Sequence, residues 1–288
     1  MNKALLFFNR VLAVLVVIGL VMVIYLFWAR PYQLRWGATE AELLRGMPGD
    51  ELNPDPTFLA TRAITIEGTP EEIWPWLLQM GYGRAGFYGY DILENIGSPY
   101  GIRSVDRILP EFQHFTVGDE VPLSAAGGLV FYAIEPNQYL IWSGSKGWGG
   151  FTWALYPMDE NHTRLVSRAR FSHNTTESSQ FLFDVFTEFS DHLAVRKILQ
   201  GVKGQVEERR EPFAIQNVEF AVYLIALLTF VAALGFILLH PFTWQRWLAG
   251  CAAGIAWLIT WYAPLPIWIG ALLELLVLWN MRNAFRKR

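Results

Sequence analysis

The sequence is poor in cysteine and shows no concentration of basic charge. Its single cysteine, Cys251, has no partner in the chain, so an internal disulfide is excluded. Because Cys251 lies in an apolar stretch, we interpret it as a small buried hydrophobic residue. The 23 lysines and arginines and the 26 aspartates and glutamates leave a formal net charge of −3, without a basic stripe or an arginine-rich arm. Nucleic acid is therefore not expected as a partner.

Sequence signatures of catalysis and cofactor binding are also missing. The five histidines show no spacing typical of metal ligands: His114, His162, His173, His192 and His240. There is no G-x-S-x-G nucleophile elbow and no phosphate-binding loop. The glycines at 81, 83 and 86 mimic a dinucleotide-binding loop, but they follow a predicted helix rather than a strand. We therefore expect no metal, no cofactor and no catalytic residue.

Long apolar runs are present, and they lie at the two ends of the chain. The overall hydrophobic fraction is 53%, above the roughly 45–50% of an ordinary soluble protein. Residues 11–28 contain no charge, which is about the length that a helix needs to cross a bilayer. Arg10 and Arg30 flank this run, and Trp28 and Tyr32 lie where interfacial aromatics are expected.

We interpret residues 1–36 as an uncleaved signal anchor with one transmembrane helix. The alternative is a cleaved signal peptide. Against that alternative, the apolar run is long, and the residues that follow it form a poor cleavage site.

The last part of the chain, residues 213–288, repeats the apolar signal. Three runs, 220–239, 247–262 and 267–279, are separated by a polar turn and a proline-containing break. We expect about three transmembrane helices here, although a hairpin of two long helices is an alternative. Glu274 interrupts the last run without a basic partner in the sequence around it.

Basic residues at the two ends of the chain predict the orientation. Lys3 and Arg10 precede the first apolar run, and four basic residues crowd the last seven positions. By the positive-inside rule, both termini are expected in the cytoplasm of a multi-pass cell-membrane protein. Four spans would place the middle of the chain on the extracytoplasmic face. Arg30 and Arg35 oppose this orientation.

Residues 37–212 resemble an ordinary globular sequence. A predicted strand at 61–67 is followed by a helix start at Thr69-Pro70-Glu71-Glu72, where threonine at the N-cap and glutamate at the third position form a capping box. Strands dominate from residue 114 onward, and residues 178–209 predict a long helix. This order predicts an α+β domain in which a curved antiparallel sheet grips the C-terminal helix. Such a sheet and helix enclose a cavity where their inner side chains do not meet.

Four stretches resemble a known family. They are ATEAELLRGMPGDEL, IWPWLLQMGYGRAGFYGYDILENIG, DRILPEFQ and RKILQGVKGQVEER. Together they are similar to the SRPBCC superfamily, the START-like helix-grip group that includes polyketide cyclase/dehydrase-like and lipid-transfer proteins. The likeness is strongest to an uncharacterised, membrane-anchored bacterial branch and covers roughly residues 37–210. It implies a cavity for a lipid or another hydrophobic small molecule, and it implies no particular reaction.

Aromatic and charged residues of this domain are the candidate ligand contacts: Trp74, Tyr88, Tyr90, Asp91, Glu94, Phe131, Trp142, Trp153, Arg168 and Arg170. Arg168 and Arg170 share one side of a strand. If that side is concave, they form a charged floor with acidic partners. If it faces solvent, the alternate residues face the core instead: Leu165, Ser167, Ala169 and Phe171. For Asp91 the simpler interpretation is that it caps a short helix.

The function expected from the sequence is membrane-tethered binding of a hydrophobic molecule, including its transfer or sensing. A cyclase- or aromatase-like enzyme is an alternative, and it requires Asp91, Glu94, Glu111 or His114 inside the cavity. A third alternative is a protein-docking module with a vestigial cavity. The sequence favours a role without catalysis.

Overall fold

The chain forms two compact units. The computed structural model describes residues 3–95, 103–144, 149–172, 180–241, 243–263 and 265–286. We call Gln33–Phe213 the sheet unit, and Met1–Tyr32 together with Ala214–Arg288 the helical unit.

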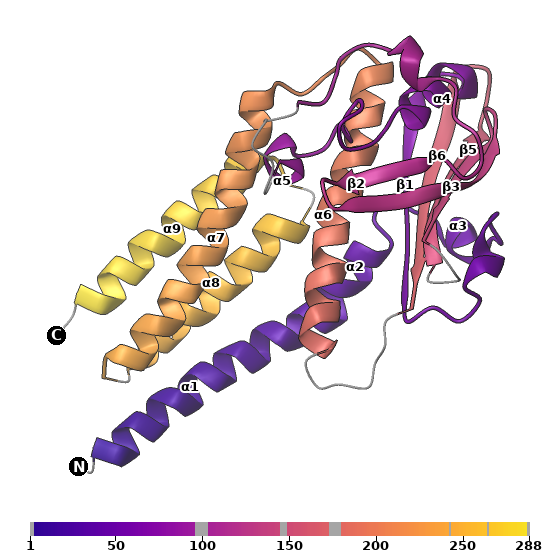
Figure 1. The fold of residues 1–288 in the computed structure, drawn as a ribbon. Coiled ribbons are helices and arrows are strands. Elements are labelled where there is room, and N and C mark those ends of the chain that lie inside the picture. Colours follow the sequence, from indigo (N-terminus) through magenta and orange to yellow (C-terminus); the bar gives the residue numbers. More distant parts are fainter. Residues whose placement is uncertain are drawn as a thin grey trace. The chain divides into compact units, whose positions relative to one another are not determined.

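A six-stranded antiparallel sheet is the framework of the sheet unit. Its order is β1-β6-β5-β4-β3-β2, so the first strand pairs with the last. The strands are β1 (Phe58–Glu67), β2 (Glu120–Ser124), β3 (Gly127–Glu135), β4 (Tyr139–Ser143), β5 (Gly149–Pro157) and β6 (His162–Phe171). The sheet is curved, and β2 and β3 run across the direction of β1 and β6 (Figure 1). Register shifts in β2 and β3 accompany this curvature. The predicted α+β class is confirmed.

The long helix α6 (Gln180–Val206) packs on one face of the sheet (Figure 1). Its Leu199 and Val202 are fully buried in one core with Leu165 of β6 and Leu140 of β4. Burial of each such side chain contributes about 1.5–3 kcal/mol. Gly201 lets α6 approach the chain closely, because a Cβ there would lie 2.0 Å from the carbonyl oxygen of Tyr88.

Short helices complete the sheet unit. They are α3 (Glu40–Leu44), η2 (Asp50–Leu52), α4 (Pro70–Leu78), α5 (Asp91–Glu94) and η3 (Pro110–Phe112). The predicted capping box of α4 is confirmed: the Glu72 amide donates to Thr69 Oγ1 at 3.4 Å, and the Thr69 amide donates to Glu72 Oε2 at 2.8 Å. These reciprocal bonds satisfy two donors that would otherwise have no partner at the helix start.

The helical unit contains α1 (Lys3–Ile24), a π-helical turn (Tyr25–Ala29), α7 (Phe213–Leu239), α8 (Trp244–Tyr262) and α9 (Ile267–Arg286), and α2 (Arg30–Leu34) continues the first helix. Among the residues that the structure describes, three separate helices thus follow the sheet unit. In the described part of the chain, two stretches are long and apolar enough to cross a membrane, Ala4–Leu34 and Ala214–Leu239. The predicted first span and the first of the three C-terminal spans lie in these stretches.

Small residues bring α8 close to its neighbours within the helical unit. A Cβ at Gly250 would lie 2.6 Å from Ile237 Cδ1, and one at Gly254 would lie 2.4 Å from Val21 Cγ2. This small-xxx-small spacing is typical of tightly packed membrane helices. Glu274 of α9 is buried and accepts a 3.5 Å hydrogen bond from Thr260 of α8.

Candidate functional site

A cavity of about 450 Å³ lies within the sheet unit, between the sheet and α6. The sheet contributes an aromatic wall, and the loop before α5 adds Phe87 and Tyr90. The residues of that wall are Phe58, Trp142, Phe151, Trp153 and Phe171. The volume is in the range of small-molecule sites, which are mostly apolar with a few placed polar groups.

The aromatic wall follows from the strand register. Trp142 of β4 pairs with Phe151 of β5, so their side chains share one face of the sheet. The rings of Trp142 and Trp153 are 5.3 Å apart, and those of Phe151 and Phe171 meet edge to face at 5.0 Å. Each such aromatic pair contributes about 0.5–1.5 kcal/mol to stability beyond the burial of its surface, and the pairs hold the wall in one shape.

One stripe of α6 forms the opposite wall. It consists of Thr187, Ser190, Asp191, Ala194, Val195 and Ile198, which recur at the helical spacing of three and four residues. The first three of these residues are polar and the last three are apolar. The α6 side of the cavity therefore changes in polarity along the helix.

Asp191 is bound by an arginine from the sheet. Arg62 of β1 is 1% exposed, and its Nη1 lies 2.6 Å from Asp191 Oδ2. The Nε of Arg62 donates to the carbonyl oxygen of Gln33 at 2.7 Å. Burial raises the pKa of Asp191, while the Arg62 guanidinium acts in the opposite direction. The pair thus puts an oriented carboxyl group on the cavity wall.

Further polar groups lie near this pair. Glu188 is buried, and Gln33 Nε2 donates to its Oε2 at 3.4 Å. His192 is fully buried, and its pKa lies well below the ordinary value because of burial and the nearby charges of Arg62 and Arg196. None of these residues was a candidate from the sequence. Apolar Phe189 and Leu193 lie beside them in the helix, and Gln33, which contacts both Glu188 and His192, lies 155 and 159 positions earlier in the chain.

One rung of the sheet carries three buried donors. Arg62 pairs with Ser167, and Ser167 pairs with Trp153. Arg62 Nη2, Ser167 Oγ and Trp153 Nε1 are buried and have no hydrogen-bond partner within the described residues. Buried donors nearly always find a partner in native proteins. This rung therefore has unused capacity to donate hydrogen bonds beside the cavity.

The aromatic candidates divide between the cavity and the core. Tyr90, Trp142 and Trp153 line the cavity. Trp74 and Phe131 are buried in the same core but do not line the cavity. Tyr88 is buried outside the lining as well, and its hydroxyl accepts from Gln79 Nε2 at 2.8 Å.

The acidic candidates do not line the cavity. Asp91 is buried and accepts hydrogen bonds from the amide and hydroxyl of Ser104 at 3.1 and 2.8 Å. The interpretation of Asp91 as a helix cap is wrong, because Tyr90 occupies the N-cap position of α5. Glu111 and His114 are exposed. The side chain of Glu94 lies outside the described part of the structure.

Arg168 and Arg170 lie on the opposite face of the sheet from the cavity. Side chains alternate along β6, so Ser167, Ala169 and Phe171 share the face of the aromatic wall and the two arginines point away from it. The prediction of a charged cavity floor is therefore wrong in its placement. The alternative assigned the inner residues correctly, but it expected exposed arginines, and Arg168 is 3% exposed.

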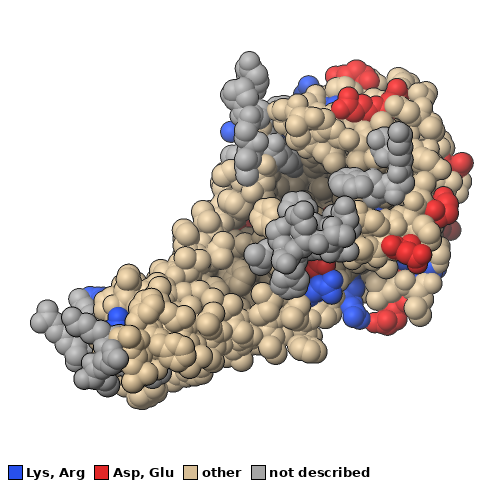
Figure 2. All heavy atoms as spheres, turned by 60° about the horizontal axis from the view of Figure 1, so that its bottom comes forward, with Lys and Arg blue, Asp and Glu red and all other residues tan. Residues whose placement is uncertain are grey.

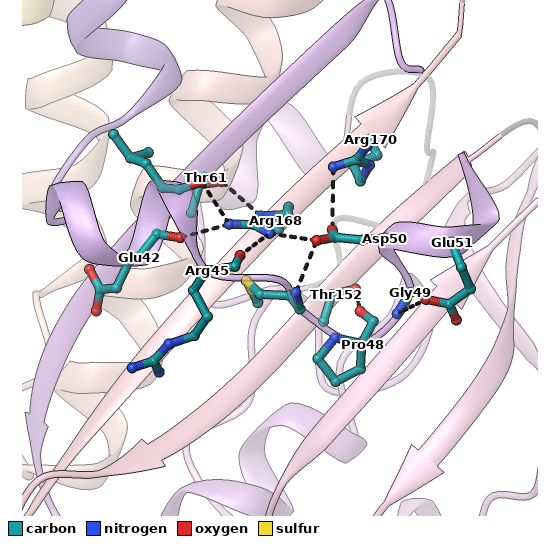
Figure 3. Close-up of polar contacts among 12 residues, drawn as sticks. Glu42, Arg45, Pro48, Gly49, Asp50, Glu51, Thr61, Thr152, Arg168 and Arg170 are labelled. Atoms are coloured by element: carbon teal, nitrogen blue, oxygen red, sulfur yellow. Dashed lines mark hydrogen bonds and ion pairs between the residues drawn. The ribbon is translucent and has the colours of Figure 1, made fainter. Parts of the chain in front are cut away.

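A segment of residues 37–54, which we call the strap, covers this outer face. Arg168 Nη1 lies 2.8 Å from Asp50 Oδ2 and 2.8 Å from the carbonyl oxygen of Arg45, and its Nη2 donates to the Glu42 carbonyl at 2.7 Å (Figure 3). Arg170 Nε donates to the Asn53 carbonyl at 2.8 Å. The two arginines thus hold the strap against the sheet.

Arg164 fixes the start of the strap. Its Nε lies 2.7 Å from Glu42 Oε1, and the Thr39 amide donates to Glu42 Oε2 at 2.7 Å in a second capping box. Burial raises the pKa of Glu42, but the Arg164 and Thr39 bonds outweigh it, so the pKa lies below its ordinary value. The described residues contain no group of three or more His, Cys, Asp or Glu that could hold a metal ion.

No family model matches the sequence, and no curated protein matches it significantly. Solved structures with a similar arrangement include a conserved protein of unknown function from Enterococcus faecalis. It is 17% identical over 62% of this chain and 93% of its own, with a TM-score of 0.27. A Polyketide_cyc-like protein from Corynebacterium glutamicum is 16% identical over 56% and 93%, with a TM-score of 0.26. A protein from Arthrobacter aurescens is 16% identical over 52% and 86%, with a TM-score of 0.29. At these scores the matches carry no argument about ligand or activity.

Proposed function

We propose that the sheet unit binds a lipid or another hydrophobic small molecule in its cavity. The observation that carries this proposal is the cavity of about 450 Å³ with its wall of aromatic side chains. Water in contact with the apolar walls of such a cavity is unfavourable, and an apolar ligand would displace that water. Tyr90, Trp142 and Trp153 are the predicted contacts that stay in this proposal.

We further propose that the helical unit anchors the protein in a membrane with both termini in the cytoplasm. Its helices carry exposed apolar side chains, among them Phe7, Leu228 and Leu275. On the face shown in Figure 2, charged side chains gather over the sheet unit, and the visible surface of the helical unit is mostly uncharged. Exposed apolar side chains on helices with few surface charges suit contact with lipid. A tether also raises the local concentration of lipid at the cavity, which suits transfer or sensing.

Binding is better supported than a cyclase-like reaction. That reaction was expected to use Asp91, Glu94, Glu111 or His114 inside the cavity. Asp91 is engaged with Ser104, and Glu111 and His114 are exposed. The carboxyl group on the cavity wall is that of Asp191, which is bound to Arg62.

A cavity-filling substitution tests the proposal. Ala194 lines the cavity on α6 and is itself exposed, so the larger side chain of Ala194→Trp has room to enter the space. We expect native mass spectrometry of the full chain to detect bound lipid in the wild type and a marked loss in this variant. Ala41→Trp is the matched control, because Ala41 is exposed on α3 away from the cavity lining. Equal lipid occupancy in wild type and Ala194→Trp would contradict the proposal.

A further inference from the structure

The wall of the cavity carries one carboxylate among the residues that line it. Asp191 stands beside Thr187 and Ser190, and the next turns of α6 offer Ala194 and Ile198. Ser190 already donates its hydroxyl hydrogen to the Thr187 carbonyl at 3.1 Å, so its oxygen is left as an acceptor. Together these residues form a polar end that accepts hydrogen bonds. The rest of the wall is apolar, so a ligand that fits both parts is an amphiphile.

The charges around this polar end cancel. Arg62 pairs with Asp191 at 2.6 Å, and its positive charge and that of Arg196 both act on His192. The negative charge of Glu188 acts on Asp191. Two arginines, Arg62 and Arg196, and two acidic residues, Asp191 and Glu188, are therefore close together here. A ligand with a net charge would add an unbalanced charge to a buried site, which is costly.

The chemistry of Asp191 separates two kinds of polar head. A hydroxyl group can donate a hydrogen bond to the Asp191 carboxylate, and a hydrogen bond to a charged acceptor contributes about 1.5–3 kcal/mol. A ligand carboxylate at the same place would face a like charge and has no hydrogen to donate when it is ionised. Arg62 offers a ligand carboxylate only its Nη2, because Asp191 engages its Nη1 and the Gln33 carbonyl its Nε. A single donor compensates only part of the repulsion from Asp191.

We infer that the cavity selects neutral amphiphiles with a hydroxyl head, such as long-chain alcohols and monoacylglycerols, over fatty acids. Asp191 accepts the hydrogen bond of the head group, and Arg62 is the positioning residue that orients Asp191. This inference rests on the proposed function, because it names the ligand class of the same cavity.

Two photoreactive probes of equal chain length test the inference. One is a long-chain alcohol and the other the corresponding fatty acid, each with a diazirine in the chain. The full-length protein is studied in phosphatidylcholine nanodiscs at about pH 9, where the acid is ionised. Labelling of cavity peptides is divided by labelling of the helical unit in the same sample, which corrects for the amount of probe in the membrane. We expect the alcohol to label the cavity about tenfold more than the acid, as one hydrogen bond to a charged group implies.

Asp191→Asn provides the decisive variant, because it removes the charge and keeps the shape. It leaves Arg62 without its carboxylate partner. We therefore expect the fatty acid to label the cavity more and the alcohol to label it less, so that the ratio of alcohol to acid labelling falls about tenfold. Asp159→Asn is the matched control on an exposed turn, where the wild-type preference should persist. Because Asp191→Asn could disturb folding, the preference of the wild type for the alcohol is a test that does not depend on this variant. A double variant, Arg62→Gln with Asp191→Asn, removes both charges together. It should also abolish the preference for the alcohol.

The outcomes separate the two proposals. Equal labelling of the cavity by both probes in the wild type, or a preference for the acid, overturns this inference and leaves the proposed function standing. A preference that survives in Asp191→Asn overturns it as well. Labelling of the cavity by neither probe overturns the proposed function and this inference with it.

Discussion

Replacement of Arg168 by methionine removes the guanidinium that holds the strap to the sheet and keeps the length of the apolar stem. Four hydrogen bonds of 2.7–3.0 Å are lost, to Thr61, Asp50 and the carbonyls of Arg45 and Glu42. Hydrogen bonds to charged groups contribute about 1.5–3 kcal/mol each, but their contributions are not additive. Breaking a buried ion pair from one side costs about 3–5 kcal/mol, and we expect a loss in this range.

Urea unfolding of the full-length protein, followed by hydrogen exchange of the strap amides, measures this loss. With a slope of about 2 kcal/mol per molar urea, the midpoint for the sheet unit should fall by about 2 M. Amides of the strap should exchange faster than those of α6, because the strap opens first.

Arg209→Met is the matched control for this prediction. Arg209 is 70% exposed and pairs with Glu67 at 3.6 Å, so its loss should cost less than about 1 kcal/mol. If Arg168→Met were no more destabilising than Arg209→Met, the strap would not depend on Arg168 and the reasoning from its burial would be refuted.

Three further predictions follow from the structure. Burial lowers the pKa of His192, so on acidification the unfolded state binds a proton that the folded state does not. The free energy of unfolding should therefore fall by up to about 1.4 kcal/mol per pH unit below about pH 6.5. Urea unfolding of His192→Gln should lack this part of the pH dependence. Gly254→Val should cost about 1–3 kcal/mol in thermal unfolding, since its Cβ would clash with Val21, whereas Gly235→Val, which meets nothing within 4 Å, should cost less; equal effects would argue against close packing of α8. With Cys251→Ala as background, Ala126→Cys on the exposed β2–β3 turn should react with a membrane-impermeant maleimide in intact cells; labelling only after lysis would place the sheet unit in the cytoplasm.

Local signals in the sequence predicted the elements of the sheet unit well. The capping box at Thr69 and Glu72 marked the start of α4 because its partners are three residues apart. The strand pattern of residues 163–171 likewise identified β6. In both cases the information lies within a few residues of the chain.

The side of β6 that faces the cavity could not be predicted. Alternation showed that Arg168 and Arg170 share a face, but both faces of this strand are largely buried. The strap covers one face and α6 the other, so the usual contrast between apolar and polar positions is lost. That an arginine is buried can be recognised only when the carbonyl groups that accept its hydrogen bonds are known.

The polar end of the cavity escaped prediction for a related reason. The type of residue does not mark the buried side of α6, because Phe186 is 66% exposed, while Glu188 and His192 are buried. Asp191 is paired with Arg62, which lies 129 positions before it, and Glu188 and His192 contact the equally distant Gln33. No pattern within the helix reports on a partner so distant.

The pairing of β1 with β6 has a consequence for how the protein is made. Phe58 at the start of β1 finds its partner, Phe171, only at the end of β6. During synthesis β1 therefore waits with an unpaired edge until the other strands have emerged, and such non-local pairing is slow and exposed to aggregation. Helix α6 emerges from the ribosome after β6, so the cavity can close only then. The apolar helix α7 follows directly after α6. Closure of the cavity and emergence of the apolar helix α7 are thus expected to coincide in time.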